Sequence, residues 1–484
     1  MSTFALWRLF HRPGTRGTAG HTSMLAIIAF AAATAIFLTV LGGVHGFVWR
    51  ASADHTFACM FDSASCAPGT YEVWMRRLTD SNDPAQYASS YVVLAVFACI
   101  LLIVPFVALA GSAARLAASR RDARLAALRL IGVSQAQVMR LTALDAAGQA
   151  LVGALAGVVG YFALMPVVML LNFQNQHFTF EQLWVGSPAL AAVIVGVIAL
   201  ALVSSLITLR RVAITPLGVT ARQSQPLPTG WRVVIFVVVF VGALAVLGNM
   251  QLFSGLGAGV LYAMIFAMIA LPFALVNLIG SWVVAARARA KARRPKDAAT
   301  MIAMRRILDN PKRAWRNVSG IALAVFIAGI TSVASLFGDS ATPMGADPND
   351  PNLLFARDIG TGGLLTLAFA AVLAAVSCGV MQAGSVYDQA NEYRLLVLEG
   401  TDVRTLNRAR FIEVLTPLTV VVVVAAGCSF ALMLPLFSQS MTAPATLISF
   451  AGGVALCFAL VSIGAFASNR VAASLNLTDY RADD

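Results

Sequence analysis

Long apolar runs separated by short polar segments make up most of the chain. Ten of these runs come close to or exceed the length of about 20 residues that a helix needs to cross a bilayer. They cover residues 24–48, 90–113, 142–172, 187–209, 232–249, 259–286, 317–337, 361–385, 412–436 and 446–468. The pattern predicts an all-α polytopic membrane protein with ten transmembrane helices.

The first apolar run follows a basic leader, as the apolar part of a secretory signal peptide does. The run is longer than such a segment, and no clear A-x-A cleavage site follows it. We therefore predict that this run is retained as a transmembrane helix.

The distribution of basic residues predicts how the chain is oriented in the membrane. With the N-terminus in the cytoplasm, only Arg50, Arg76, Arg77 and Arg357 lie outside, which leaves 30 of the 34 Lys and Arg inside. Such a bias predicts that both termini are cytoplasmic. The net charge of +12 then reflects this bias and contact with anionic lipid headgroups, and we predict no nucleic-acid binding.

A cytoplasmic motif occurs twice. Residues 120–151 begin as a basic amphipathic stretch and enter a Gly-rich apolar run, and residues 388–417 repeat this pattern 268 positions later. Each copy predicts a short helix, a break at a glycine and a helix that re-enters the membrane. The repeat divides the chain into a four-helix unit at 1–222 with a small external loop at 50–89, a two-helix insertion with a basic linker at 223–299, and a second four-helix unit at 300–484.

Small residues distinguish the two copies. The re-entering run of the first copy carries four glycines at spacings of three to five, namely Gly148, Gly153, Gly157 and Gly160. This spacing predicts close contact with another membrane helix. The second copy has an unbroken valine run at 420–424 instead, so the halves are not equivalent.

Catalytic and metal-binding patterns are missing from the sequence. Only Lys291, Lys296 and Lys312 are lysines and none follows a glycine, which excludes a G-x-x-x-x-G-K-[ST] nucleotide-binding loop. No G-x-S-x-G or H-E-x-x-H motif is present. We predict that the chain is not an enzyme and binds no metal. The nearly uncharged span interiors also argue against a secondary carrier.

Two pairs of residues leave alternatives open. Asp145 and Glu413 occupy matched positions near the start of a re-entering helix. Each is either favoured there by the helix dipole or forms an ion pair or hydrogen bond with the neighbouring stalk. Cys59 and Cys66 share the first external loop, where they form either a disulfide or two free thiols.

The repeated motif resembles the FtsX-like permease domain of ABC transporters. The first copy carries R-x-x-x-L-R-x-x-G-x-x-x-x-Q-V followed by an acid, at Arg124, Leu128, Arg129, Gly132, Gln137, Val138 and Asp145. The second copy resembles it more weakly, through Glu392, Leu396, Gly400, Leu406 and Glu413. Two such domains bridged by two extra spans are most similar to the BceB-type layout within the type VII, or MacB/BceB/LolCE-like, class.

The resemblance implies that the short helices are coupling helices for a separate ATPase. Their residues would be Arg124, Leu125, Leu128, Arg129, Gly132, Leu395, Leu396, Glu399 and Gly400. Two copies of a cytoplasmic ABC ATPase would bind ATP and Mg, and this chain would hold no cofactor. The alternative to a coupling helix is a solvated, lipid-facing helix, which is the usual form of a basic amphipathic stretch beside a membrane.

The resemblance further implies a permease of the bacterial plasma membrane. It would use ATP to export, or to extract from the outer leaflet, a hydrophobic or amphipathic molecule such as a drug, peptide or lipid, which suggests a role in antimicrobial resistance. The alternative is a non-transporting mechanotransmission complex that regulates a cell-envelope partner. The family's large external domain is absent here, since those loops have only about 40 and 23 residues, which suggests an external accessory protein.

Overall fold

The computed structural model describes residues 19–51, 84–119, 135–213, 230–256, 258–339, 351–388, 395–441 and 444–473. Within these ranges the chain is helical apart from short connections and one two-stranded hairpin, which confirms the all-α prediction. Of the first copy of the repeated motif, at residues 120–151, the part at 120–134 lies outside the described residues, and so do Cys59 and Cys66.

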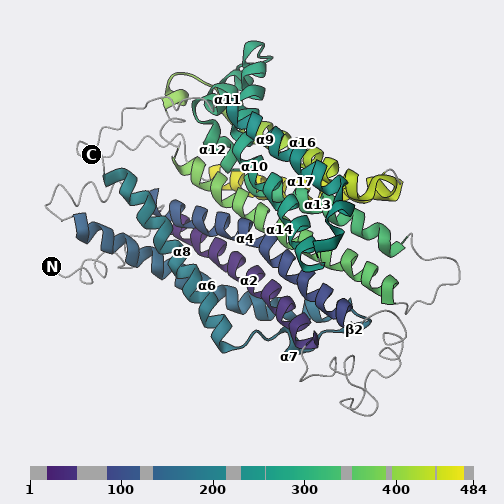
Figure 1. The fold of residues 1–484 in the computed structure, drawn as a ribbon. Coiled ribbons are helices and arrows are strands. Elements are labelled where there is room, and N and C mark those ends of the chain that lie inside the picture. The colour runs from purple at the N-terminus through teal and green to yellow at the C-terminus, as the bar shows by residue number, and fades with distance from the viewer. Residues whose placement is uncertain are drawn as a thin grey trace. The chain divides into compact units, whose positions relative to one another are not determined.

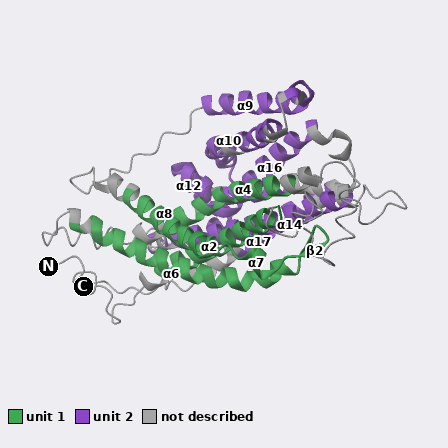
Figure 2. Cartoon of the chain, turned by 60° about the horizontal axis from the view of Figure 1, so that its bottom comes forward, with its two compact units in different colours: residues 1–222 green, residues 223–484 purple. Residues whose placement is uncertain are grey.

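The chain divides into two compact units, residues 1–222 and 223–484 (Figures 1 and 2). The second unit contains the two inserted helices as well as the last four long helices.

Unit 1 has four long helices. They are α2 (Ala19–Ala51), α4 (Pro84–Ser119), α6 (Gln135–Met169) and α8 (Ser187–Ala213). Between α6 and α8 the chain forms the strands β1 (Asn172–Phe173) and β2 (Gln176–His177) and the short helix α7 (Phe180–Leu183). We call residues 170–186 the hairpin segment, and the end of unit 1 where it lies the hairpin end.

Unit 2 begins with the inserted pair α9 (Trp231–Gly248) and α10 (Ala258–Arg293), joined by the 3-10 helix η3 (Met250–Leu256). Two shorter helices follow, α11 (Ala298–Asp309) and α12 (Pro311–Arg316). The remaining long helices are α13 (Ser319–Asp339), α14 (Pro351–Asp388), α16 (Val403–Met441) and α17 (Pro444–Ala473).

Every predicted span coincides with one of the long helices. In the described parts of the chain, eight helices are long and apolar enough to cross a membrane: α2, α4, α6, α8, α9, α10, α14 and α16. The spans predicted at 317–337 and 446–468 fall on α13 and α17, whose apolar stretches are the shorter ones Ser319–Gly329 and Phe450–Leu460. The chain is therefore a multi-pass membrane protein.

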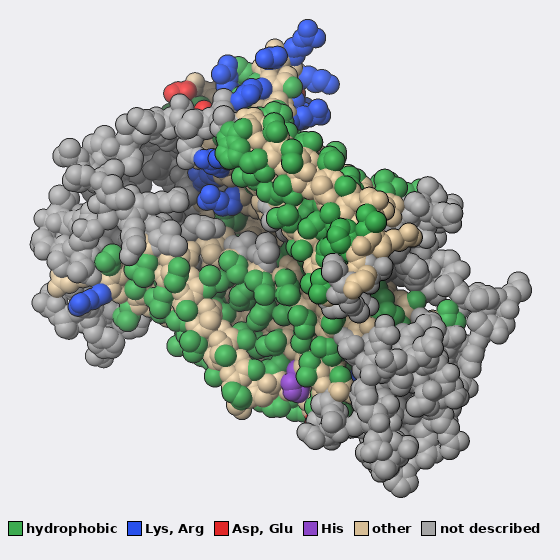
Figure 3. Space-filling view, viewed as in Figure 1, with side chains coloured by type: hydrophobic (Ala, Val, Ile, Leu, Met, Phe, Trp, Pro, Cys, Tyr) green, Lys and Arg blue, Asp and Glu red, His purple; other side chains and the backbone are tan. Residues whose placement is uncertain are grey.

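Exposed side chains agree with a lipid-facing surface. Large apolar residues such as Val159, Val195 and Val238 are more than 60% exposed along the helix shafts, and Figure 3 shows hydrophobic side chains covering the described shafts. Lysine and arginine side chains gather at the α11 end of unit 2. Burying those charges in hydrocarbon would be costly, so this end belongs at the water boundary.

The halves differ in how their last helix packs. In unit 1, α8 contacts both α4 and α6. In unit 2, α17 packs mainly against α13 and α14, whereas α16 packs against α13 and is also flanked by α9, α10 and α11. The inserted pair therefore packs beside the helix in which the second motif ends.

Candidate functional site

The second copy of the repeated motif forms a capped helical turn. Leu395–Leu398 are helical and Gly400 has a φ of +91°, a left-handed conformation that favours glycine. The Gly400 N–H donates to the Val397 carbonyl at 3.0 Å, and the Thr401 N–H donates to the Leu396 carbonyl at 2.9 Å. These two bonds form a Schellman C-cap, so the break predicted at Gly400 is confirmed.

Two leucine side chains of this turn are exposed on the surface. Leu395 and Leu398 are each 60% exposed, whereas Leu396 and Val397 are half-buried. The chain then reverses through Thr401 and Asp402 into α16. The described residues therefore place an exposed leucine pair in the helical turn directly before a long helix. Of the predicted contact residues, the structure exposes Leu395 and Glu399 more than Leu396.

The acidic residue near the start of α16 forms an ion pair. Glu413 Oε2 lies 3.8 Å from Arg306 Nη1, and the two side chains are 24% and 15% exposed. Arg306 belongs to α11, the amphipathic helix before α13, and not to the stalk. A second ion pair, Arg408 with Asp297 at 3.0 Å, joins the same part of α16 to the start of α11. The helix that follows the exposed turn is therefore fastened to α11.

Asp145 lies at the matched place in unit 1. It is half-buried on α6, one turn before Gly148. The other predicted residues of the first coupling motif (Arg124, Leu125, Leu128, Arg129 and Gly132) lie outside the described residues.

The amphipathic segment before α13 is also attached to the inserted pair. Asn310 caps α12, because its Oδ1 accepts a hydrogen bond from the Arg313 N–H at 3.0 Å, and Pro311 occupies the first helical position. This cap orients Trp315, which is buried against Gly280 of α10. Together with the ion pairs to α16, these contacts make α11 and α12 a bridge between α10 and α16.

In unit 1, glycines bring α6 against α2 along their length. A Cβ on Gly153 would lie 2.5 Å from Phe30 Cβ, and one on Gly157 would lie 2.6 Å from Thr34 Cβ. Gly160 approaches Ala35, while a Cβ on Gly148 would meet nothing within 4 Å. The predicted close helix contact is therefore confirmed for three of the four glycines, and its partner is α2.

At the hairpin end, one arginine joins α2 to the hairpin segment. Arg50 is only 1% exposed. It donates to Gln182 Oε1 at 3.2 Å, to the Phe173 carbonyl at 3.0 Å, to Gln174 Oε1 at 2.9 Å and to the His177 carbonyl at 3.2 Å. Its guanidinium carbon also lies 4.2 Å from the ring centre of Phe178, a cation–π contact.

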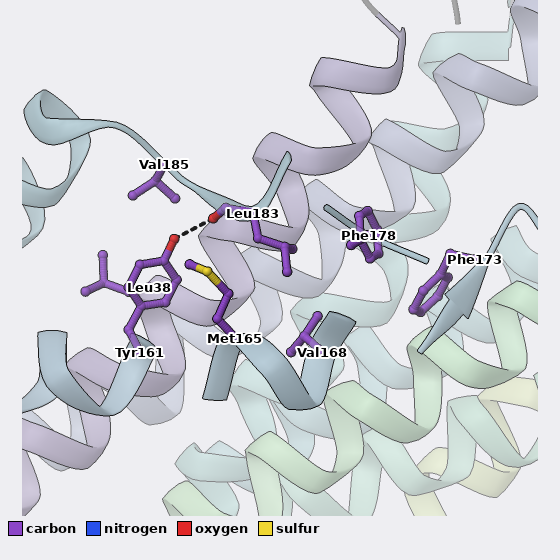
Figure 4. Packing of buried hydrophobic residues seen from close by; sticks show 8 residues of the cluster. All are labelled: Leu38, Tyr161, Met165, Val168, Phe173, Phe178, Leu183 and Val185. Atoms are coloured by element: carbon purple, nitrogen blue, oxygen red, sulfur yellow. Dashed lines mark hydrogen bonds between the residues drawn. The ribbon is translucent and has the colours of Figure 1, made fainter. Parts of the chain in front are cut away.

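Further contacts reinforce this attachment, which we call the Arg50 clasp. His45 Nδ1 lies 2.8 Å from the Gln182 carbonyl oxygen, and the Tyr161 hydroxyl of α6 donates to the Leu183 carbonyl (Figure 4). Below them is a buried apolar cluster in which α2, α6 and the hairpin segment all take part: Leu38, Tyr161, Met165, Val168, Phe173, Phe178, Leu183 and Val185. Gly42 and Gly46 let the hairpin segment approach the backbone of α2.

Sequence reasoning treated Arg50 only as one of four external charges. The signal that could have pointed to it is an arginine at the end of an apolar helix. A buried guanidinium requires several acceptors, and the 170–186 connection supplies Gln174 and Gln182.

Comparison with known proteins gives one family match. Residues 93–217 match the family described as FtsX-like permease C-terminal. This segment extends from α4 through the first copy of the motif to the residues just after α8, and it supports the FtsX-like permease family for unit 1. No curated protein and no solved structure matches the chain. No group of His, Cys, Asp or Glu in the described ranges could hold a metal ion.

Proposed function

We propose that this chain is the permease subunit of an ATP-driven ABC transporter in a bacterial plasma membrane. It couples a separate cytoplasmic ATPase dimer to the export, or extraction from the outer leaflet, of a hydrophobic or amphipathic molecule. Two ATPase copies bind ATP and Mg, and the two copies of the motif each contact one of them. The FtsX-like match across the first copy supports this proposal.

The single observation that carries the proposal is the capped turn at 395–400. Leu395 and Leu398 are each 60% exposed at the turn, and contact with a partner protein would remove them from water. The turn leads directly into α16, and the pair Glu413–Arg306 attaches α16 to α11. A force applied at the turn therefore acts on α16 and on the bridge to the inserted helices together.

A non-transporting mechanotransmission complex is the second candidate. The observation that favours it is the Arg50 clasp, because α2 ends at Ala51, directly before the segment 52–83. Such an arrangement suits the transmission of movement across the membrane to an external accessory protein. ATP hydrolysis that responds to added lipophilic compounds would favour transport, and hydrolysis that stays constant would favour signalling.

The coupling assignment is tested by co-purification with the ATPase encoded nearest to this chain. The variant Leu395→Asp/Leu398→Asp, combined with Leu128→Asp, should reduce the recovered ATPase at least tenfold. Asp removes the apolar contact and adds charge to its place. Arg305→Asp is the matched control, because Arg305 is exposed on α11 and receives the same new side chain. Undiminished recovery with the triple variant would refute the coupling helices.

A further inference from the structure

We infer that Arg50 is a positioning residue through which the first unit, and not the second, passes movement of α6 to the segment that follows Ala51. This inference rests on the proposed function, because it assumes that an ATPase moves the residues that precede α6. Unit 1 is then the half of the permease that transmits the movement, and Arg50 is the side chain through which it does so.

The first step is that α6 and α2 are joined along their length. α6 starts within the first copy of the motif, at Gln135, and has 35 residues, so it is about 52 Å long. Gly153 and Gly157 bring its backbone against Ile27, Phe30 and Thr34 of α2. Closely packed interiors transmit displacement because they resist compression. A displacement at the start of α6 therefore reaches the hairpin end with α2 attached.

The second step is that the hairpin segment joins α2 to α6 at the hairpin end. Four hydrogen bonds converge on the buried Arg50 guanidinium, and their acceptors come from β1, the turn, β2 and α7. A guanidinium donates in fixed directions, so it fixes the orientation of all four pieces. Because Arg50 is the penultimate residue of α2, its four bonds fix the end of α2 relative to the hairpin segment.

The third step is a backbone conformation that the clasp helps to maintain. Gln174 and Asn175 form the two-residue loop of the hairpin, with φ of +57° and +58°. Asparagine is common in such turns, but glutamine is disfavoured there. The side chain of Gln174 is nevertheless only 3% exposed, with its Oε1 2.9 Å from Arg50. A disfavoured residue kept in this turn is explained by its bond to Arg50.

The fourth step is that the described residues of unit 2 show no matching device. α16 ends at Met441 and α17 begins at Pro444, so two residues connect them in place of the 17 that form the hairpin segment. No basic residue lies in the last turn of α13, the helix that matches α2. The inserted pair lies beside α16 instead. The cytoplasmic motif is thus duplicated, while in the described parts of the chain the clasp occurs in unit 1 alone.

The test follows hydrogen–deuterium exchange in the full chain with its ATPase in lipid nanodiscs, with and without a non-hydrolysable Mg–ATP analogue. In the wild type, the analogue should change exchange in segment 52–83 at least threefold and leave segment 340–350 unchanged. Arg50→Gln should abolish the change in 52–83 while ATPase binding and hydrolysis stay within about twofold. Arg357→Gln is the matched control, because Arg357 is exposed in unit 2 and loses the same charge.

Two further variants keep the inference testable if Arg50→Gln does not fold. Gln174→Asn suits the turn but is too short for the 2.9 Å bond, and it should reduce the change in 52–83 by at least half. Arg50→Lys keeps the charge but not the planar fork, so it should give a response between those of the wild type and Arg50→Gln.

Three outcomes would overturn the inference. The change in exchange at 52–83 could be the same in the wild type, Arg50→Gln and Gln174→Asn. In the wild type, the analogue could change exchange at 340–350 as much as at 52–83, or it could change neither segment although the ATPase is bound. Failure of the ATPase to bind at all would instead refute the proposed function, and the inference with it. A measurement on the purified chain without ATPase separates failure of the inference from failure of the proposed function. There, Arg50→Gln should raise exchange in the hairpin segment at least tenfold, because this effect does not depend on ATPase binding.

Discussion

Trp315 of α12 lies against Gly280 of α10, and its indole N–H donates to Asn277 Oδ1 at 3.3 Å. A Cβ on Gly280 would overlap the indole ring. This contact attaches the helix pair inserted between the two repeats to the segment that leads into α13.

Gly280→Ala should therefore lower the free energy of unfolding by about 1–3 kcal/mol, the usual range for overpacking a filled interior. The measurement is thermal unfolding of the purified chain in detergent. Gly242→Ala on α9 is the control, because a Cβ there would meet nothing within 4 Å. Equal melting temperatures for the two variants would contradict the packing of Trp315.

Gly157→Ala should weaken the contact between α6 and α2. The added Cβ would lie 2.6 Å from Thr34 Cβ and 2.8 Å from the Ala31 carbonyl oxygen, so the helices must separate. We expect a loss of about 1–3 kcal/mol, and crosslinking between cysteines placed on α2 and α6 should become slower. Gly148→Ala, which has open space, should change neither quantity.

The ion pair Glu413–Arg306 should contribute more than Arg408–Asp297, although its N–O distance is longer. Glu413 and Arg306 are 24% and 15% exposed, whereas Arg408 and Asp297 are 65% and 43% exposed. Water and salt screen exposed pairs, which typically contribute about 0.2–1 kcal/mol. Double-mutant cycles with neutral replacements should give a coupling energy for Glu413–Arg306 near the top of that range and one near zero for Arg408–Asp297. The reverse order would be evidence against the α11–α16 attachment.

Gly400→Val should disrupt the cap of the 395–398 turn, while Gly400→Asn should be tolerated. A Cβ at this position would meet nothing within 4 Å, so the cost comes from the φ of +91° and not from a clash. Left-handed backbone costs most residues about 1–2 kcal/mol, and asparagine less. We expect co-purification of the ATPase to fall about tenfold for valine and less than threefold for asparagine. Similar losses for both variants would indicate a different role for Gly400.

Cys59 and Cys66 stay a prediction for direct chemical testing. If they form the external disulfide, a membrane-impermeant maleimide added to intact cells should label them only after reduction. Cys99, Cys378, Cys428 and Cys457 lie in predicted spans and should stay unlabelled in both conditions. Labelling without a reductant would show two free thiols.

The local pattern of the sequence was sufficient for the elements and their breaks. Hydropathy located the long helices of the described residues, eight of which are long and apolar enough to span a membrane, because an apolar run of that length has few alternatives to a helix in a bilayer. Gly400 was predictable as a cap because glycine adopts positive φ at low cost. The spacing of Gly153, Gly157 and Gly160 was enough to predict a close-packed face.

The partners of these elements were not predictable in the same way. The acceptors of Arg50 lie 123 to 132 residues further along the chain, and Trp315 meets a glycine 35 residues before it. The sequence left open whether Glu413 is favoured by the helix dipole or bonds to a stalk, and the structure pairs it with Arg306 on α11. Such pairs depend on how each helix is rotated about its axis and on which neighbour fills its grooves, and hydropathy carries neither quantity.

The membrane class, the helix positions, the repeated motif and the small-residue face of α6 thus follow from the sequence alone, because each depends on residues close together in the chain. Three relationships became apparent only in three dimensions: this face packs on α2, α11 and α12 bridge α10 to α16, and Arg50 closes unit 1 at the hairpin end. These relationships arise from side chains brought together from distant segments, where burial makes each hydrogen bond and close contact specific to its partner.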